Sequence, residues 1–174
     1  MCGDTFSFNA FILDLDKIKT YDIEVGVQYQ EIKTSDVPLP LLLEADPSEA
    51  SINTYLKDSW CFAAIYGGRV VGVCVATLKD EGIAEIVNVS VYPDFQQKGI
   101  GSDMLRFALA QLATKNVKRV ELGTGTFGYQ LTYYQRLGFR VDAVVKDYFI
   151  EHYPKPIFEH GIQHQDMLRL YRDL

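Results

Sequence analysis

The sequence is poor in cysteine and histidine, and both shortages narrow what the protein can be. Its three cysteines cannot all pair, and Cys61 and Cys74 fall inside segments that we predict to be strands. Buried free thiols are typical of a reducing compartment, so we expect a cytoplasmic protein without structural disulfides. The three histidines, His152, His160 and His164, have a spacing that matches no metal-binding pattern, so we expect no metal site.

Basic residues are also in the minority, at 17 Lys and Arg against 23 Asp and Glu. The resulting net charge of -6 disfavours nucleic acid as a general partner. A cationic substrate would suit such a chain, although a solvated acidic surface explains the same charge. No apolar run approaches the roughly 18–20 residues that a membrane span needs, and the first residues lack the layout of a signal peptide. We therefore expect neither nucleic acid nor a membrane as a partner.

The length of 174 residues suits one domain with a sizeable core. We assign residues 26–174 to that domain and residues 1–25 to an N-terminal extension. The extension carries apolar residues such as Phe6, Phe8 and Leu13, so we expect it to pack on the domain or on a second copy. Strand-like and helix-like segments follow one another in mixed order, which predicts an α/β sheet flanked by helices.

A strand, a loop and a helix in the middle of the chain form the most informative stretch. Ile83–Val91 is rich in β-branched residues and predicts a buried strand, and residues 102–115 carry apolar residues at helical spacing. The loop between them contains Lys98, Gly99 and Gly101. Glycine lets the backbone approach an anion closely, and a helix start offers unpaired N–H groups and a partial positive charge. The stretch therefore predicts a site for a diphosphate.

The spacing of the loop residues separates this site from other phosphate loops. The lysine precedes the glycines, unlike that of a P-loop, and Met104 stands where a dinucleotide-binding loop needs its third glycine. The pattern Gln96-x-x-Gly99-x-Gly101, with Val91-x-Pro93 upstream, instead resembles the acyl-CoA signature of the GNAT superfamily of N-acetyltransferases. A second block, Tyr133-Tyr134-Gln-Arg-Leu-Gly138-Phe139, resembles the later Phe-Tyr-x-x-x-Gly-Phe block of that superfamily. The resemblance covers residues 27–146.

The resemblance implies a central mixed, mostly antiparallel sheet of roughly six to seven strands flanked by about four helices. It also implies that acetyl-CoA is the co-substrate and that a primary amine, on a small molecule or a peptide, attacks it directly. The alternative is a module that binds CoA for sensing or assembly without turnover, and a homodimer stays open. The residues that the resemblance assigns to acetyl-CoA are Val89, Ser90, Val91, Gln96, Gln97, Lys98, Gly99, Ile100, Gly101 and Ser102.

Two side chains are candidates for catalysis. Glu85 lies among apolar neighbours in the predicted strand, and a carboxylate buried beside a cleft would suit a general base. The alternative is a glutamate at a strand edge, paired with a lysine or arginine. Tyr134 matches the tyrosine whose hydroxyl points at the cofactor sulfur in the superfamily, and a phenol with a pKa near 10 can protonate a departing thiolate. The alternative for Tyr134 is a core aromatic.

The chain departs from the superfamily at Phe127, which stands where many members have an asparagine that contacts the cofactor. The resemblance also places Glu44 and Asp46 beside the acceptor site, as contacts for a cationic amine. Alternatively, Asp46 caps the helix that follows and Glu44 is solvated. The aromatic residues 148–158 have three interpretations: a wall of the substrate pocket, a dimer interface or part of the core.

Overall fold

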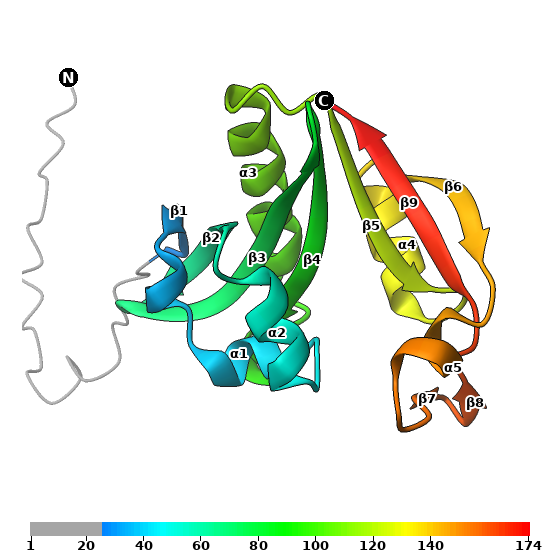
Figure 1. Cartoon of the computed structure of the whole chain (residues 1–174). Coiled ribbons are helices and arrows are strands. Elements are labelled where there is room, and N and C mark those ends of the chain that lie inside the picture. The colour runs from blue at the N-terminus through cyan, green and yellow to red at the C-terminus, as the bar shows by residue number, and fades with distance from the viewer. Residues whose placement is uncertain (1–25) are drawn as a thin grey trace, which may run out of the picture.

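Seven strands of the described residues, 26–174, form one sheet in the order β1-β2-β3-β4-β5-β9-β6 in the computed structural model (Figure 1). The strands are β1 (Gln28–Ile32), β2 (Ser59–Tyr66), β3 (Arg69–Asp80), β4 (Ile83–Val91), β5 (Arg119–Gly125), β6 (Arg140–Val145) and β9 (Met167–Asp173). All neighbours are antiparallel except β4 and β5, which are parallel. The mixed, mostly antiparallel sheet predicted from the sequence is confirmed. A separate small hairpin joins β7 (Phe158–Glu159) and β8 (Ile162–Gln163).

The helices lie on both faces of this sheet. In the part of the chain that the structure describes they are α1 (Leu39–Leu43), α2 (Glu49–Tyr55), α3 (Ile100–Thr114), α4 (Tyr129–Arg136) and α5 (Tyr148–His152), with short 3-10 turns at Thr34–Asp36 and Pro93–Phe95. None of the helices within residues 26–174 combines the length and the apolarity that a membrane crossing requires.

The strand β3 runs through the middle of two cores. Cys74 and Ala76 face the apolar side of α3, whereas Val73 and Val75 face α1 and α2. All four side chains are fully buried. Successive side chains of a strand point to opposite faces, so an uninterrupted apolar run is what a strand covered on both sides requires. The burial of this part of the sheet therefore follows directly from the sequence.

The pairing of β4 with β5 is short. Ile83–Ile86 pairs with Arg119–Leu122, and beyond these residues β4 keeps β3 on one side and has no strand on the other. Figure 1 shows the two strands diverging from their paired end, near the C-terminus. Therefore β4, an interior strand of the sheet, has an unpaired edge over part of its length, in addition to the unpaired edges of the two outermost strands.

A β-bulge lies where the divergence begins. Ala76 pairs with Ile86 but Val75 pairs with Asn88, so Val87 is an extra residue on β4. Val87 packs on the α1 side of the sheet, and the Asn88 amide donates to the carbonyl of Leu42 on the same side at 3.0 Å. Two successive side chains thus point to one face, and the backbone after the bulge is turned relative to the backbone before it.

The start of α2 differs slightly from the prediction. The N-cap is Ser48, whose hydroxyl accepts from the Ser51 N–H at 3.2 Å. Asp46 lies two residues before this cap, where its carboxylate accepts from the Ser48 N–H at 3.0 Å and the Ser51 hydroxyl at 2.7 Å. Asp46 therefore stabilises the turn that leads into the cap, because both oxygens accept from the first turn of the helix.

The predicted N-terminal extension, residues 1–25, lies outside the described residues, so its packing stays a prediction. Residues 26–174 contain the whole sheet and both cores.

The packing of α3 predicts a large loss of stability when its buried face is truncated. Leu105 is fully buried in the core between α3 and the sheet. We expect Leu105→Ala to lower the free energy of unfolding by about 2–5 kcal/mol, because it removes apolar contacts and leaves a cavity. Leu78→Ala is the matched control, since Leu78 is 60% exposed on β3. Urea denaturation followed by circular dichroism measures both; equal losses would contradict this description of the core.

Candidate active site

A cavity of about 1100 Å³ lies where β4 and β5 part. One wall is the free edge of β4 with the loop that leads into α3. The opposite wall is the end of β5, residues 123–125, with α4. Side chains from α2 and α5 line the far end. The cavity thus collects both sequence motifs, the loop before α3 and the block around Tyr134, from segments that are distant in the chain.

The free edge of β4 presents backbone groups to this cavity. The Tyr92 N–H donates to the Val71 carbonyl at 3.0 Å, which makes that residue pair a hydrogen-bonded pair of the β3–β4 ladder. Because hydrogen bonding alternates along an antiparallel strand, Ser90 also faces β3, and the N–H and C=O groups of Val89 and Val91 face away from it. They face the side on which β4 has no partner, as expected for a strand that pairs with an extended ligand.

The loop before α3 contains a run of free backbone donors. No N–H group from Gln97 to Ser102 has an acceptor among residues 26–174; the first helical bond runs from Asp103 N–H to Gly99 C=O. Gln97 and Gly99 have left-handed backbone angles, with φ of 58° and 81°. These angles turn successive amides toward one concave side, the arrangement that binds anions.

The side chains of the loop have different roles. Gln96 donates to the Val91 carbonyl at 2.8 Å and so holds the loop against the end of β4. Lys98 donates to the Asp94 carbonyl at 2.8 Å, and Ile100 is buried in the core. Neither lines the cavity. The side chains of these two residues therefore do not contribute to the cavity wall, and the Lys98 ammonium is held by the Asp94 carbonyl over the Phe95 ring.

A second, smaller hollow of about 540 Å³ is lined by several arginines. Arg106 and Arg136 line both the cavity and this hollow, and Arg140 and Arg172 complete the ring of four. Arg172 also donates to the Leu137 carbonyl, which fixes it to the end of α4. This end of the cavity is therefore positively charged.

The two neighbouring tyrosines of α4 are used differently. The Tyr133 hydroxyl donates to the Gly101 carbonyl at 2.8 Å and ties α4 to the first turn of α3. The Tyr134 side chain lines the cavity, and its hydroxyl has no hydrogen-bond partner among the described residues and is not sealed from solvent. Burial raises the pKa of Tyr134, so the phenol stays protonated well above neutral pH.

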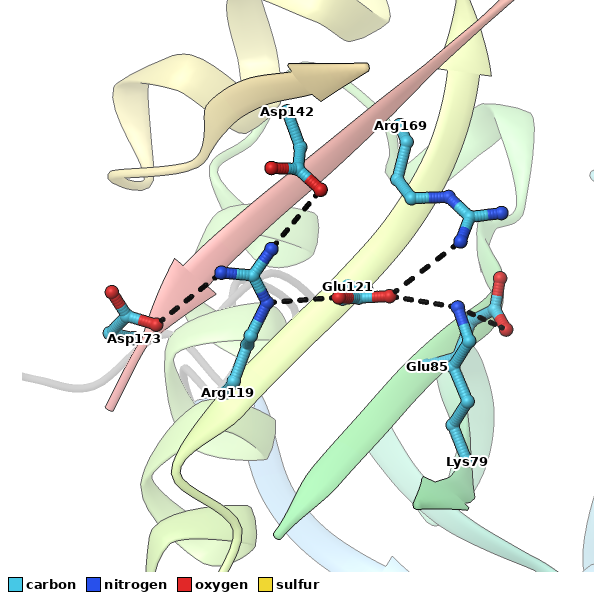
Figure 2. A network of polar contacts seen from close by, with 7 residues as sticks. All are labelled: Lys79, Glu85, Arg119, Glu121, Asp142, Arg169 and Asp173. Carbon is cyan, nitrogen blue, oxygen red and sulfur yellow. Dashed lines mark hydrogen bonds and ion pairs between the residues drawn. The ribbon is translucent and has the colours of Figure 1, made fainter. Parts of the chain in front are cut away.

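Glu85 belongs to a network of charged side chains on β3, β4, β5, β6 and β9 (Figure 2). Its carboxylate lines the cavity, and its side chain is 33% exposed, more than its apolar neighbours in the sequence predict. Lys79 lies 3.7 Å away but is closer to Glu121, at 2.8 Å. The alternative role predicted for Glu85 from the sequence was an ion pair with a lysine or arginine. Such a pair is present with Lys79, but at 3.7 Å the contact is long.

Glu121 is the centre of the network. Its side chain is 11% exposed and lies 2.8 Å from Lys79 and 2.9 Å from Arg119. The hydrogen bond from Lys79 and then that from Arg119 lower the pKa of Glu121, against the effect of burial. Arg119 reaches Asp142 at 3.2 Å as well, and Arg169 lies 3.9 Å from Glu121. Apart from an ion pair for Glu85, this cluster was not predicted, because its members come from five strands.

The far end of the cavity is lined by tyrosines and carboxylates. Tyr55 accepts a hydrogen bond from the Asn88 amide at 3.1 Å, and burial raises the pKa of Tyr55 to about 12. Tyr148, Phe149 and Tyr153, all from the aromatic segment 148–158, line this cavity. Asp46 and Glu44, both named from the sequence, line the same end.

Phe127, at the position where an asparagine is common in the superfamily, packs against a histidine. Its ring stacks on His164, with centroids 4.3 Å apart and planes 3° from parallel. His164 is buried, and its Nε2 lies 3.2 Å from a carboxylate oxygen of Glu159. Among residues 26–174 no three His, Cys, Asp or Glu side chains are grouped as metal ligands would be. The position therefore serves packing.

The sequence alone missed Asn88, Tyr55, Arg106 and Arg169 as wall residues. Asn88 carried the one usable signal, a polar side chain inside an apolar strand. Its Oδ1 is buried without a partner in the described part of the chain, as is the hydroxyl of Ser90 next but one. The sequence around Tyr55, Arg106 and Arg169 is typical of surface residues. Their position on the cavity wall becomes evident only from the three-dimensional arrangement of the strands and helices.

The fold and these features together define a family. A sequence profile of the Acetyltransferase (GNAT) family matches residues 29–139, and the chain belongs to this family of acetyltransferases. It is also similar to the uncharacterized N-acetyltransferase YvbK of Bacillus subtilis strain 168, with 39% identity over 153 residues, which are 87% of this chain and 96% of that protein. The resemblance read from two motifs is confirmed.

Two solved structures are similar over most of this chain. The IAA acetyltransferase from Bacillus cereus ATCC 14579 has a TM-score of 0.81 and 39% identity, covering 86% of this chain and 100% of that one. A GNAT family acetyltransferase from Elizabethkingia anophelis, crystallised with acetyl-CoA bound, has a TM-score of 0.80 and 35% identity, covering 85% and 98%. These similarities cover a larger share of the chain than the matched profile, residues 29–139.

The charge network predicts an acid-dependent loss of stability. We expect Glu121→Gln to lower the free energy of unfolding near pH 7 by about 2 kcal/mol, since it removes the anion that Lys79 and Arg119 share. A carboxylate whose pKa is lower in the folded state than in the unfolded state stabilises the fold at pH values above its unfolded-state pKa. That stabilisation is lost as the pH falls through the folded-state pKa. The difference between wild type and variant should therefore shrink below the ordinary pKa of 4.5.

Asp142→Asn is the control for this measurement, because the Asp142 side chain is 41% exposed at the rim of the network. Its effect on unfolding should stay within about 0.5 kcal/mol across the same pH range. A pH-independent difference between wild type and Glu121→Gln would contradict the assigned role of Glu121.

Proposed function

We propose that this chain is an N-acetyltransferase that moves an acetyl group from acetyl-CoA to a primary amine by direct attack within a ternary complex. The observation that carries the proposal is that the free amides of residues 97–102 and the Tyr134 hydroxyl open into one cavity. A thioester with a diphosphate in its tail needs both an anion site and a proton donor. The acetyl-CoA bound in the Elizabethkingia anophelis relative, at 35% identity, supports the same co-substrate here.

The donor is held mainly by backbone groups. The amides from Gln97 to Ser102 bind the diphosphate, and the free N–H groups of Val89 and Val91, with the C=O of Val89, pair with the pantetheine arm as an added strand would; the Val91 carbonyl is already bound by Gln96. Arg106 and Arg136 reach the phosphate at the adenosine end, where the smaller hollow is lined by arginines. The residues proposed from the sequence thus act through their main chain, apart from Gln96, which braces the loop.

The acetyl transfer then needs two proton movements. The amine nitrogen attacks the thioester carbonyl carbon, the N–C bond forms and the C–S bond breaks. The Val89 N–H, just beyond the bulge, stabilises the negative charge that develops on the carbonyl oxygen. Tyr134 gives its proton to the departing sulfur, and the proton lost by the amine passes to Glu85, directly or through water. Solvent restores the Tyr134 proton and takes the one on Glu85.

The cysteines of the described residues support direct attack over a covalent acetyl-enzyme. Cys61 and Cys74 are fully buried and neither lines the cavity. Burial raises the pKa of Cys61 to about 12 and that of Cys74 further. A thiol becomes a nucleophile only as the thiolate, so neither side chain can accept an acetyl group at neutral pH.

Glu85 suits the role of base through its position more than through its burial. It lies on the cavity wall two residues before the bulge, and its partner Lys79 is bound more closely by Glu121. The carboxylate is therefore available to a proton on the acceptor side of the thioester. The second candidate function is CoA binding without turnover, and the free Tyr134 hydroxyl favours catalysis over that alternative, because a binder has no use for a proton donor there.

Gly99→Ala tests the anion site. We expect the variant to bind CoA at least about tenfold more weakly, since a Cβ at φ 81° strains the turn and projects where the diphosphate lies. Gly68→Ala is the matched control, because Gly68 has φ 76° with open space around it in a hairpin away from the cavity. Isothermal titration calorimetry measures both; equal CoA affinities in the two variants would exclude this loop from the site.

Tyr134→Phe tests the proton donor. We expect kcat for amine-dependent thiol release to fall about 100-fold, with CoA affinity little changed. Tyr129→Phe, on the same helix but 69% exposed, should keep the wild-type rate. A coupled thiol assay with a panel of amines measures the rates from pH 6 to 9.5. Full activity of Tyr134→Phe at every pH would remove its assignment as the acid, and saturable CoA binding without thiol release by wild type would establish the non-catalytic alternative.

A further inference from the structure

We propose that the acceptor of this enzyme is zwitterionic, an amino acid whose carboxylate is bound by Arg169 while its amine faces Glu85 and the thioester. The inference rests on the proposed function and narrows its substrate class. It starts from Arg169, a cation that lines the cavity together with the acidic residues Glu44, Asp46 and Glu85.

The Arg169 guanidinium has unused hydrogen-bonding capacity. Its side chain is 36% exposed and forms no hydrogen bond with any described residue. The contact with Glu121 is long, at 3.9 Å, and Glu121 already has Lys79 at 2.8 Å and Arg119 at 2.9 Å. Two closer cations therefore neutralise that carboxylate, and the planar fork of Arg169 stays free for a carboxylate in the cavity.

Arg169 and Glu85 lie on the same part of the wall. Lys79 and Arg169 both meet the same Oε2 atom of Glu121, and Lys79 also contacts Glu85 (Figure 2). The Tyr148 phenol lies within range of both charges: burial raises its pKa, Glu85 and Asp46 raise it further, and Arg169 opposes them. A positive and a negative side chain thus stand next to each other beside the phenol.

This arrangement discriminates between kinds of amine. An acceptor that carries only positive charge, such as a polyamine, meets the Arg169 guanidinium in the same cavity as Glu85 and Asp46, which is unfavourable in a partly enclosed space. An acceptor with a carboxylate beside its amine satisfies Arg169 on one side and Glu85 with Asp46 on the other. Arg169 therefore selects for amino acids by attraction and against plain amines by repulsion.

Matched acceptors provide the test. Phenylalanine, methionine and lysine are each compared with the amine left when the carboxylate is removed, and kcat/KM is measured from thiol release. For wild type we expect the amino acid to exceed its decarboxylated partner by at least about tenfold. In Arg169→Gln that ratio should fall to about one, through a higher KM for the amino acid, while kcat/KM for the decarboxylated amine stays equal or rises.

Arg69→Gln is the matched control, because Arg69 is an exposed arginine outside the cavity. It should keep the wild-type ratio. We expect thermal unfolding to show that Arg169→Gln stays folded, because Lys79 and Arg119 still hold Glu121. Preference of wild type for the decarboxylated amines, or an unchanged ratio in Arg169→Gln, would overturn the zwitterionic acceptor and leave acetyl transfer to amines standing. Absence of thiol release with every amine would overturn both proposals.

Discussion

The short parallel pairing between β4 and β5 is the constraint on which the site depends. The pairing ends at Ile86 and Leu122, and the extra residue Val87 turns the backbone just as the partner strand departs. A sheet that stayed paired would satisfy the backbone of Val89 and Val91 internally and leave no cavity. Because it divides, a strand edge with open hydrogen-bonding groups is presented inside the protein, where bulk water competes less for them than at an outer edge.

Two sets of contacts hold the structure together around the point where β4 and β5 separate. On the α1 side, the Asn88 amide bonds to the Leu42 carbonyl and the Tyr55 hydroxyl, and so fastens the bulge to the helices. At the paired end, Glu121 joins Lys79 of β3 to Arg119 of its own strand, and so adds ionic contacts where only a few backbone bonds hold the two halves together. The cavity is thus bounded by well-fixed groups at its origin and widens away from them.

The sequence predicted the elements well, among them the strand, loop and helix that present unpaired amides before α3. The glycine spacing at 96–101 and the block at 133–139 are local patterns, and local patterns fix backbone conformation directly. Glu85 was placed correctly on a strand but with too much burial, since its exposure depends on β5 leaving β4 a few residues later. Arg169 could not be predicted, because its position depends on contacts among strands that are far apart in the chain, whereas Tyr148 was named from the sequence only as one of several aromatic residues with three open interpretations. Asp46 needed only local geometry, and its role beside the cap was predicted to within two residues.

Glu159 and His164 fasten the segment between β6 and β9 to the loop before α4, through the Phe127 stack and the carboxylate against Gly128. The residues proposed to bind and activate the thioester lie within 85–138, while Tyr148, Phe149 and Tyr153 of this separately attached segment line the opposite end of the cavity, with Arg169 just beyond them. Under the proposed acetyl transfer, substitutions in this segment would reshape the space for the acceptor without touching the residues assigned to the donor.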